Sequence, residues 1–126
     1  MNRLWRTVMT VSILVALAGT TFYVLQRRVR LPKDFTQVDR APHTFPDYQD
    51  CIIPPNIAPM NFVVKEAGSK FRARLYGDAG KKILVGSRDG KIVIPIKQWK
   101  ALLAANVGGS VHVDVFAHSA ENGWQR

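Results

Sequence analysis

Three side chains that could bind a metal ion or transfer protons occur near the C-terminal end of the chain: His112, Asp114 and His118. Residues two apart in an extended strand share a face, so all three would lie on one side. His112 and Asp114 would be about 7 Å apart, but His118 would lie about 20 Å from His112, which is too far for a single metal ion. The spacing therefore favours a solvated or cross-strand paired face, and we predict no catalytic residue, metal site or cofactor.

The other residues with chemical potential are scattered. Most carboxylates fall in predicted turns, where their side chains bond the backbone. Cys51 is the only cysteine, so the chain can form neither an internal disulfide nor a thiolate-rich metal site. The basic strand 70–77 contains Phe71 and Tyr76, but these two rings point to opposite faces, whereas sheets that bind RNA present aromatics and cations on one face. We therefore predict no nucleic-acid partner.

Three aromatic residues are predicted to point outward from the strands, and they form the candidate interaction surface: Tyr76, Phe116 and Trp124. Exposed aromatic rings of this kind dock proteins or stack on sugars. A sugar platform requires the three rings to be exposed and coplanar.

Period-two alternation dominates the chain after residue 61 and predicts strands over 62–67, 70–77, 82–87, 91–96 and 110–119. In the last strand, Val111, Val113, Val115 and Ala117 are predicted to face inward, and His112, Asp114, Phe116 and His118 outward. Asp89-Gly90 predicts a hairpin turn, and apolar spacing predicts a short helix over 97–106. The predicted fold class is mainly β: a small antiparallel β-sandwich of the immunoglobulin or fibronectin type, with one short helix, preceded by an N-terminal transmembrane helix.

The N-terminal helix is predicted from 19 consecutive uncharged residues, Thr7–Leu25. A helix of this length is about 28 Å long, close to the thickness of the hydrocarbon layer. Of the net charge of +9, +6 belongs to residues 1–33, which flank this segment and contain no acidic residue. We therefore predict that residues 7–25 contact membrane lipid.

Two alternatives remain open for this segment. Ala16-Leu17-Ala18 resembles a signal-peptidase site, so cleavage after Ala18 competes with an uncleaved anchor. The count of positive charges on its two sides favours a cytoplasmic domain, whereas a short N-terminal tail and the predicted fold favour an exported one. We predict a single-pass inner-membrane protein whose C-terminal domain lies in the periplasm.

Prolines mark the region that joins the helix to the β-domain. Six of the seven prolines fall between residues 31 and 60, where they favour extended backbone. We predict an anchor over residues 1–30, a tether over 31–46 and a β-domain over 47–126, which ends in the middle of a hairpin and so suggests a fragment of a longer protein. Residues 47–62 are expected to lie along the domain as an edge segment.

The run Ile53-Pro54-Pro55-Asn56-Ile57-Ala58-Pro59 resembles a known family. With flanking residues across 45–126, among them Asp89-Gly90-Lys91, Trp99-Lys100 and Gly108-Gly109, it is similar to the N-terminal region of membrane-anchored TolB-like β-propeller proteins of Bacteroidetes-type bacteria, named for cytochrome c biogenesis. In those proteins this region precedes a haem-attachment segment and a propeller. With Cys51 alone, this chain cannot hold that haem motif.

The resemblance implies an exported accessory domain tethered to the inner membrane. We therefore expect a non-catalytic interaction module, the front part of a larger TolB-like protein, whose partner is another protein or a C-terminal propeller. A cell-surface module that binds carbohydrate or peptidoglycan is the alternative. An enzyme or electron carrier would need residues beyond Arg126.

Overall fold

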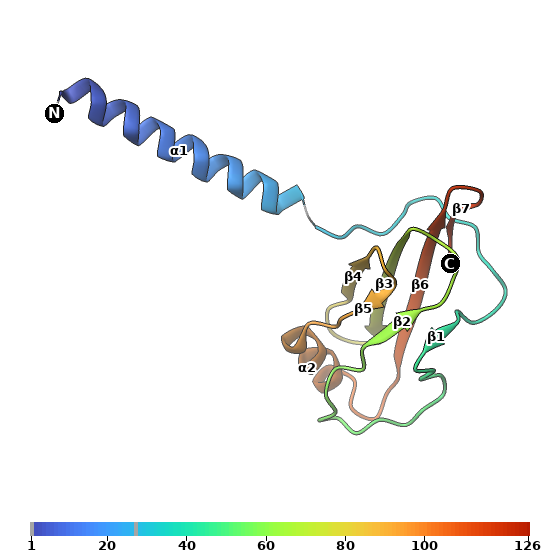
Figure 1. The fold of residues 1–126 in the computed structure, drawn as a ribbon. Coiled ribbons are helices and arrows are strands. Elements are labelled where there is room, and N and C mark those ends of the chain that lie inside the picture. Colours follow the sequence, from blue (N-terminus) through green and yellow to red (C-terminus); the bar gives the residue numbers. More distant parts are fainter. Residues whose placement is uncertain (1, 27) are drawn as a thin grey trace.

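The computed structural model describes residues 2–26 and 28–126, apart from the side chains of residues 3, 4, 6 and 21–26. A long helix is followed by strands and a second, short helix (Figure 1). The elements in order are α1 (Arg3–Gln26), β1 (Thr44–Phe45), β2 (Phe62–Val64), β3 (Lys70–Gly77), β4 (Ile83–Ser87), β5 (Lys91–Ile92), α2 (Ile96–Ala105), β6 (Val111–Ser119) and β7 (Gly123–Gln125).

The strands form two antiparallel sheets. One sheet has four strands in the order β4-β3-β6-β7, and the other has three in the order β1-β2-β5. The longest pairing joins β3 to β6, from Lys70 opposite His118 to Gly77 opposite Val111. The predicted antiparallel sheets, with a short helix before the last long strand, are confirmed. The hairpin predicted at Asp89-Gly90 was wrong, because the strands on either side of this turn belong to different sheets: β4 pairs with β3, and β5 pairs with β2.

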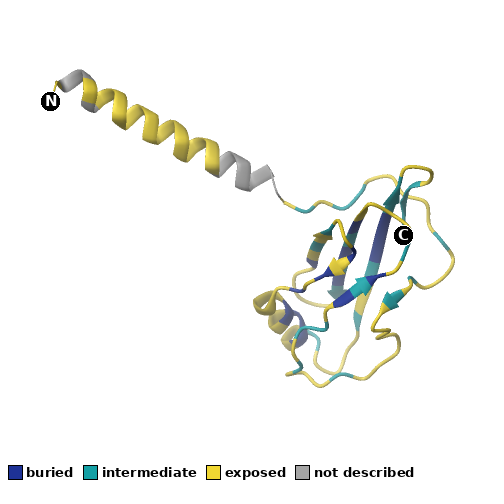
Figure 2. Ribbon diagram, in the orientation of Figure 1, coloured by how far each residue is buried: buried dark blue, intermediate teal, exposed yellow. Residues whose placement is uncertain are grey.

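The hydrophobic core lies where the two sheets and α2 meet (Figure 2). Each of the three elements presents an apolar face: the long sheet contributes Phe71, Ala73 and Leu75 from β3, the short sheet contributes residues of β2 and β5, and α2 contributes Trp99, Leu102 and Leu103. Burial of each large side chain contributes about 1.5–3 kcal/mol, so this shared core holds the three elements together.

Strand lengths follow the pattern closely in the long sheet and less closely in the short one. β3 has its predicted bounds, but β2 ends at Val64 and β5 at Ile92. Beyond β5, the side chain of Asn61 accepts a hydrogen bond from the Ile94 backbone N–H at 2.8 Å, where a strand partner would otherwise be needed. Pro95 then lies at the N-cap of α2, so the helix begins one residue earlier than predicted.

The prediction for β6 was wrong at two positions. Phe116 was expected to face solvent, yet it is 1% exposed, because the ring of Phe35 packs edge-on against it at 5.3 Å. Val113 was expected in the core but is 42% exposed. Alternation predicted which face of the sheet each side chain points to. Whether that face is covered depends on the other segments of the chain that pack against it.

The cover over Phe116 comes from the segment before β1, which crosses the outer face of the four-stranded sheet. Its first contact is at β4, where a Cβ built on Gly86 would lie 3.1 Å from Val29. At the far edge, Thr36 forms a parallel bridge with Gln125, and its N–H donates to the Trp124 carbonyl at 2.9 Å. Part of the segment predicted as a tether, 31–46, therefore pairs with β7 and supplies β1; the domain boundaries themselves stay a prediction.

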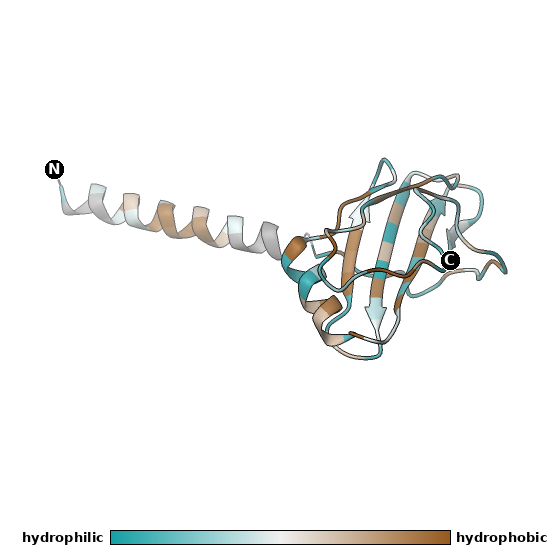
Figure 3. Ribbon diagram, turned by 90° about the horizontal axis from the view of Figure 1, so that it is seen from below, coloured by the Kyte–Doolittle hydropathy of each residue, from teal (hydrophilic) through white to brown (hydrophobic). Residues whose placement is uncertain are grey.

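Helix α1 projects from the β-unit, and its middle is strongly hydrophobic (Figure 3). Among the residues that the structure describes, no helix is both long and apolar enough to span a bilayer. The predicted span, residues 7–25, includes residues 21–25, whose side chains are not among those that the structure describes.

Candidate functional site

An open cleft lies between the first half of β6 and the segment that precedes β2, and its volume is about 790 Å³. One wall is the stretch from Ser110 to Val113 with Val115, and the other wall comes from residues 41–55. The floor is formed by core side chains of both sheets and of α2, Phe62, Leu75, Ile94, Trp99 and Leu103. A cleft of this size, open to solvent and floored by apolar groups, falls in the range of roughly 300–1,000 Å³ that is typical of binding sites.

An ion pair holds the start of the 41–55 wall. Glu66 accepts two hydrogen bonds from the Arg40 guanidinium, at 2.7 and 2.8 Å, and a third from the His43 backbone N–H at 2.7 Å. The hydrogen bonds from Arg40, the single one from the His43 backbone N–H and the Arg40 charge together outweigh the effect of burial and lower the pKa of Glu66 from 4.5 to about 2. The same interaction raises the pKa of Arg40. The carboxylate therefore stays ionised at any ordinary pH and fixes residues 40–43 beside β2.

The proline-containing run continues this wall and is fastened to the helix. The indole N–H of Trp99 donates to the Ile57 carbonyl at 3.0 Å, and Ile53, Ile57 and Met60 pack against the core. The expectation that residues 47–62 lie along the domain is thereby confirmed for this part of the run. Its function in the fold is to form the side of the cleft opposite β6.

Asn106 fixes the end of α2 beside the cleft. Its side-chain amide donates to the carbonyls of Ala79 and Leu102, and its side-chain oxygen accepts from the Ala79 N–H at 3.1 Å. The close approach requires a glycine at position 77, since a Cβ there would overlap the Asn106 side chain. This clamp links the β3–β4 turn to the loop that leads into β6.

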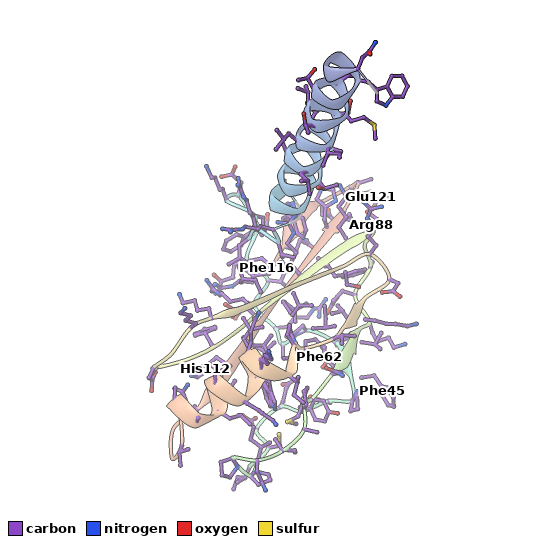
Figure 4. All side chains as sticks on the ribbon, turned by 90° about the vertical axis from the view of Figure 1, so that its left-hand side faces the viewer. Phe45, Phe62, Arg88, His112, Phe116 and Glu121 are labelled. Carbon is purple, nitrogen blue, oxygen red and sulfur yellow. The ribbon has the colours of Figure 1, made fainter. Side chains whose placement is uncertain are left out.

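The candidate interaction surface predicted from sequence does not form a common patch. Tyr76 lies beside His112 with ring centres 5.3 Å apart, whereas Trp124 lies beside His118 at 5.1 Å. The two histidines are six positions apart on β6, which corresponds to about 20 Å. Phe116, between them, is buried (Figure 4). The exposure predicted for Phe116 is therefore wrong, and the three rings cannot make one platform.

The histidine and aspartate side chains of β6 are paired across strands, as one of the predicted possibilities required. The Asp114 carboxylate accepts from Arg74 Nε at 2.9 Å, and the His112 ring packs on Tyr76. Within the described residues, no three histidine, cysteine or acidic side chains are grouped closely enough to hold a metal ion.

Sequence reasoning missed the cleft because its walls come from segments far apart in the chain. Cys51 lies at its rim, exposed, with its thiol donating to the Tyr48 carbonyl at 3.0 Å. Polar side chains line the cleft above its apolar floor, among them Asp50, Asn106 and His112, so it can offer hydrogen bonds as well as apolar contact. The one available signal was the proline-rich run, which predicted a segment lying along the domain.

No family model, curated protein or solved structure matches this chain.

Proposed function

We propose that this protein is an anchored interaction module, in which α1 is embedded in a lipid bilayer and the β-domain binds a protein partner at the membrane surface. The observation that carries the proposal is the exposure of α1. Apolar side chains on all sides of this helix are 54–66% exposed, and no part of the β-domain covers them: Trp5, Val8, Met9, Val11, Ile13, Leu14, Val15 and Leu17.

Lipid is the energetically favoured environment for the apolar side chains of this helix. Exposure of so many large apolar side chains to water forgoes about 1.5–3 kcal/mol for each one that could be buried. An amphipathic helix on a protein surface would bury one face and expose a polar one, but the apolar residues of α1 occur around its circumference. The arginines that flank residues 7–25 match the head groups on either side of a bilayer.

The location, partner and finer fold belong to the same proposal. We place the β-domain in the periplasm of a bacterium, attached to the inner membrane, and regard its fold as a β-sandwich of the immunoglobulin or fibronectin type. The resemblance of residues 45–126 to TolB-like proteins supports an accessory role beside a propeller, and the open cleft beside β6 supplies a surface for a protein partner.

Membrane fractionation tests the anchor. We expect the full chain to sediment with membranes and to resist extraction by alkaline carbonate. Leu14→Arg, a charge near the middle of the apolar run, should release a large part of the protein to the supernatant, because a central arginine costs about 2.5–3.5 kcal/mol on insertion.

Ile52→Arg is the matched control, since Ile52 is fully exposed on the β-domain. This variant should fractionate like the parent chain. Recovery of the parent chain, with Met1 retained, in the soluble fraction would refute the anchor.

A further inference from the structure

The edge of β6 that faces the cleft is paired along only part of its length. All residues from Val111 to His118 pair with β3 on one side. On the other side β7 pairs only with Ala117, His118 and Ser119. Within residues 28–126, no strand pairs with this edge of β6 between Val111 and Phe116, which leaves a row of backbone donors and acceptors open to another chain.

The side chains along this stretch are also incompletely covered. Val113 has the same inward orientation as Val115 and Ala117, which are 6% and 8% exposed, yet it is 42% exposed. Val113 lines the cleft. A ligand that filled the cleft would therefore bury the side chain of Val113, which the two sheets leave exposed.

The cleft also continues the line of β7. A small cavity of about 40 Å³ lies at the end of β7, lined in part by Gln125 and Arg126, and it shares Pro42 and Val115 with the larger cleft. A strand running antiparallel to β6 from this point would enter the cleft along the unpaired edge.

We propose that the cleft binds an extended peptide segment of a protein partner, which adds to the four-stranded sheet as an antiparallel strand beside Val111–Phe116. The mode is β-strand addition: the backbone of the peptide pairs with β6, and alternate side chains enter the cleft. Because the floor is apolar and Asp50 is the only carboxylate among the lining residues, the inserted side chains are uncharged and aliphatic. The inference rests on the proposed interaction role, but it does not depend on the membrane anchor.

A single strand fits this site better than the edge of a second copy. The cleft has two walls, and residues 41–55 stand opposite β6. If two copies paired through β6, residues 41–55 of each copy would occupy the space that the β6 strand of the other copy requires. An extended peptide has no such wall, and it presents backbone to one side and side chains to the floor.

The experiment uses the full chain in detergent micelles and a capped heptapeptide of alternating threonine and valine. Amide hydrogen exchange measured by NMR should slow at Val111, Val113 and Val115 on addition of the peptide, by at least about tenfold at saturation, and should not change at Val93. The same peptide with N-methylated amides along the edge that faces β6 keeps its side chains but cannot pair, so it should give no protection.

Variants locate the site. Val113→Glu should weaken binding of the peptide at least about tenfold, because the charge would face the apolar floor of the cleft. Val93→Glu, at a residue 63% exposed and outside the cleft, should change it less than about twofold. Equal binding of the N-methylated peptide, unchanged exchange at Val113, or protection that accompanies dimerisation without peptide would each overturn the proposal. None of these outcomes would affect the fractionation result.

Discussion

The two halves of β6 have similar alternating sequences but different surroundings. The second half, from Val115 to Ser119, has β3 on one side, β7 beside its last three residues, a core beneath it and Phe35 above it. The first half, from Val111 to Asp114, has β3 on one side only and a cleft beneath it. Identical periodicity can thus describe a closed, structural stretch and an open, binding-competent one within a single strand.

The difference arises from chain segments distant in sequence. Phe35 covers the second half from outside, whereas residues 41–55 form the wall opposite the first half and leave a cleft between them. The strand supplies a surface in both cases, and the N-terminal segments determine which part of it stays accessible.

The largest expected difference between the two halves of β6 is the stability that is lost when one side chain in each half is truncated. Phe116→Ala should lower the free energy of unfolding by about 3–4 kcal/mol, since it removes a fully buried ring and leaves a cavity under Phe35. Val113→Ala should cost less than about 1 kcal/mol, because its side chain is already partly in water. Urea unfolding of both variants measures the difference, and equal losses would show that the halves are equally packed.

Gly77→Ala should have the next largest effect on the free energy of unfolding. Gly77 pairs with Val111, so this substitution tests the beginning of the open half. The added Cβ would overlap the Asn106 side chain and displace its hydrogen bonds, at a cost of about 1–3 kcal/mol. The measurement is again urea unfolding. In an Asn106→Ala background the same substitution should cost much less, and an undiminished cost there would contradict the proposed overlap.

Glu66→Gln should have the smallest effect at neutral pH, and it concerns the wall opposite the open half. The folded-state pKa of Glu66, about 2, lies below its ordinary value of 4.5, so the carboxylate stabilises the fold above pH 4.5 and loses this contribution as the pH falls through 2. Glu66→Gln should therefore be less stable than the parent at pH 7, and the gap should close on acidification.

Thermal unfolding at several pH values measures that gap, with Glu121→Gln as a control in an exposed turn. A gap that stayed constant between pH 5 and pH 2 would contradict the ionic role of Glu66.

The sequence predicted most of the long sheet because its information is local. β3 alternates strictly. Asp89-Gly90 marks a turn, in which the Asp89 carboxylate accepts from the Lys91 N–H and the Ser87 hydroxyl, and these bonds lower its pKa. The turn joins the two sheets instead of closing a hairpin, a difference that the local signal does not reveal. The short strands β1 and β5, two residues each, depend on contacts with distant segments. No local pattern predicted β1, and alternation over residues 91–96 predicted β5 at more than its actual length.

The candidate site was harder to predict than the fold. The burial of Phe116 depends on Phe35, which lies 81 positions earlier in a region of irregular sequence. The cleft depends on where the 41–55 segment is fastened, by Arg40 with Glu66 and by Ile57 with Trp99. These are pairings over long sequence separations, which periodicity cannot reveal.

The early contact between Val29 and β4 also limits how the protein can stand on a membrane. Only two residues separate the last residue of α1, Gln26, from Val29, a reach of at most about 10 Å. If α1 is embedded as proposed, this short connection keeps the β4 end of the domain at the level of the lipid head groups and restricts the rotation of the domain. The cleft would then keep a preferred orientation relative to the membrane surface.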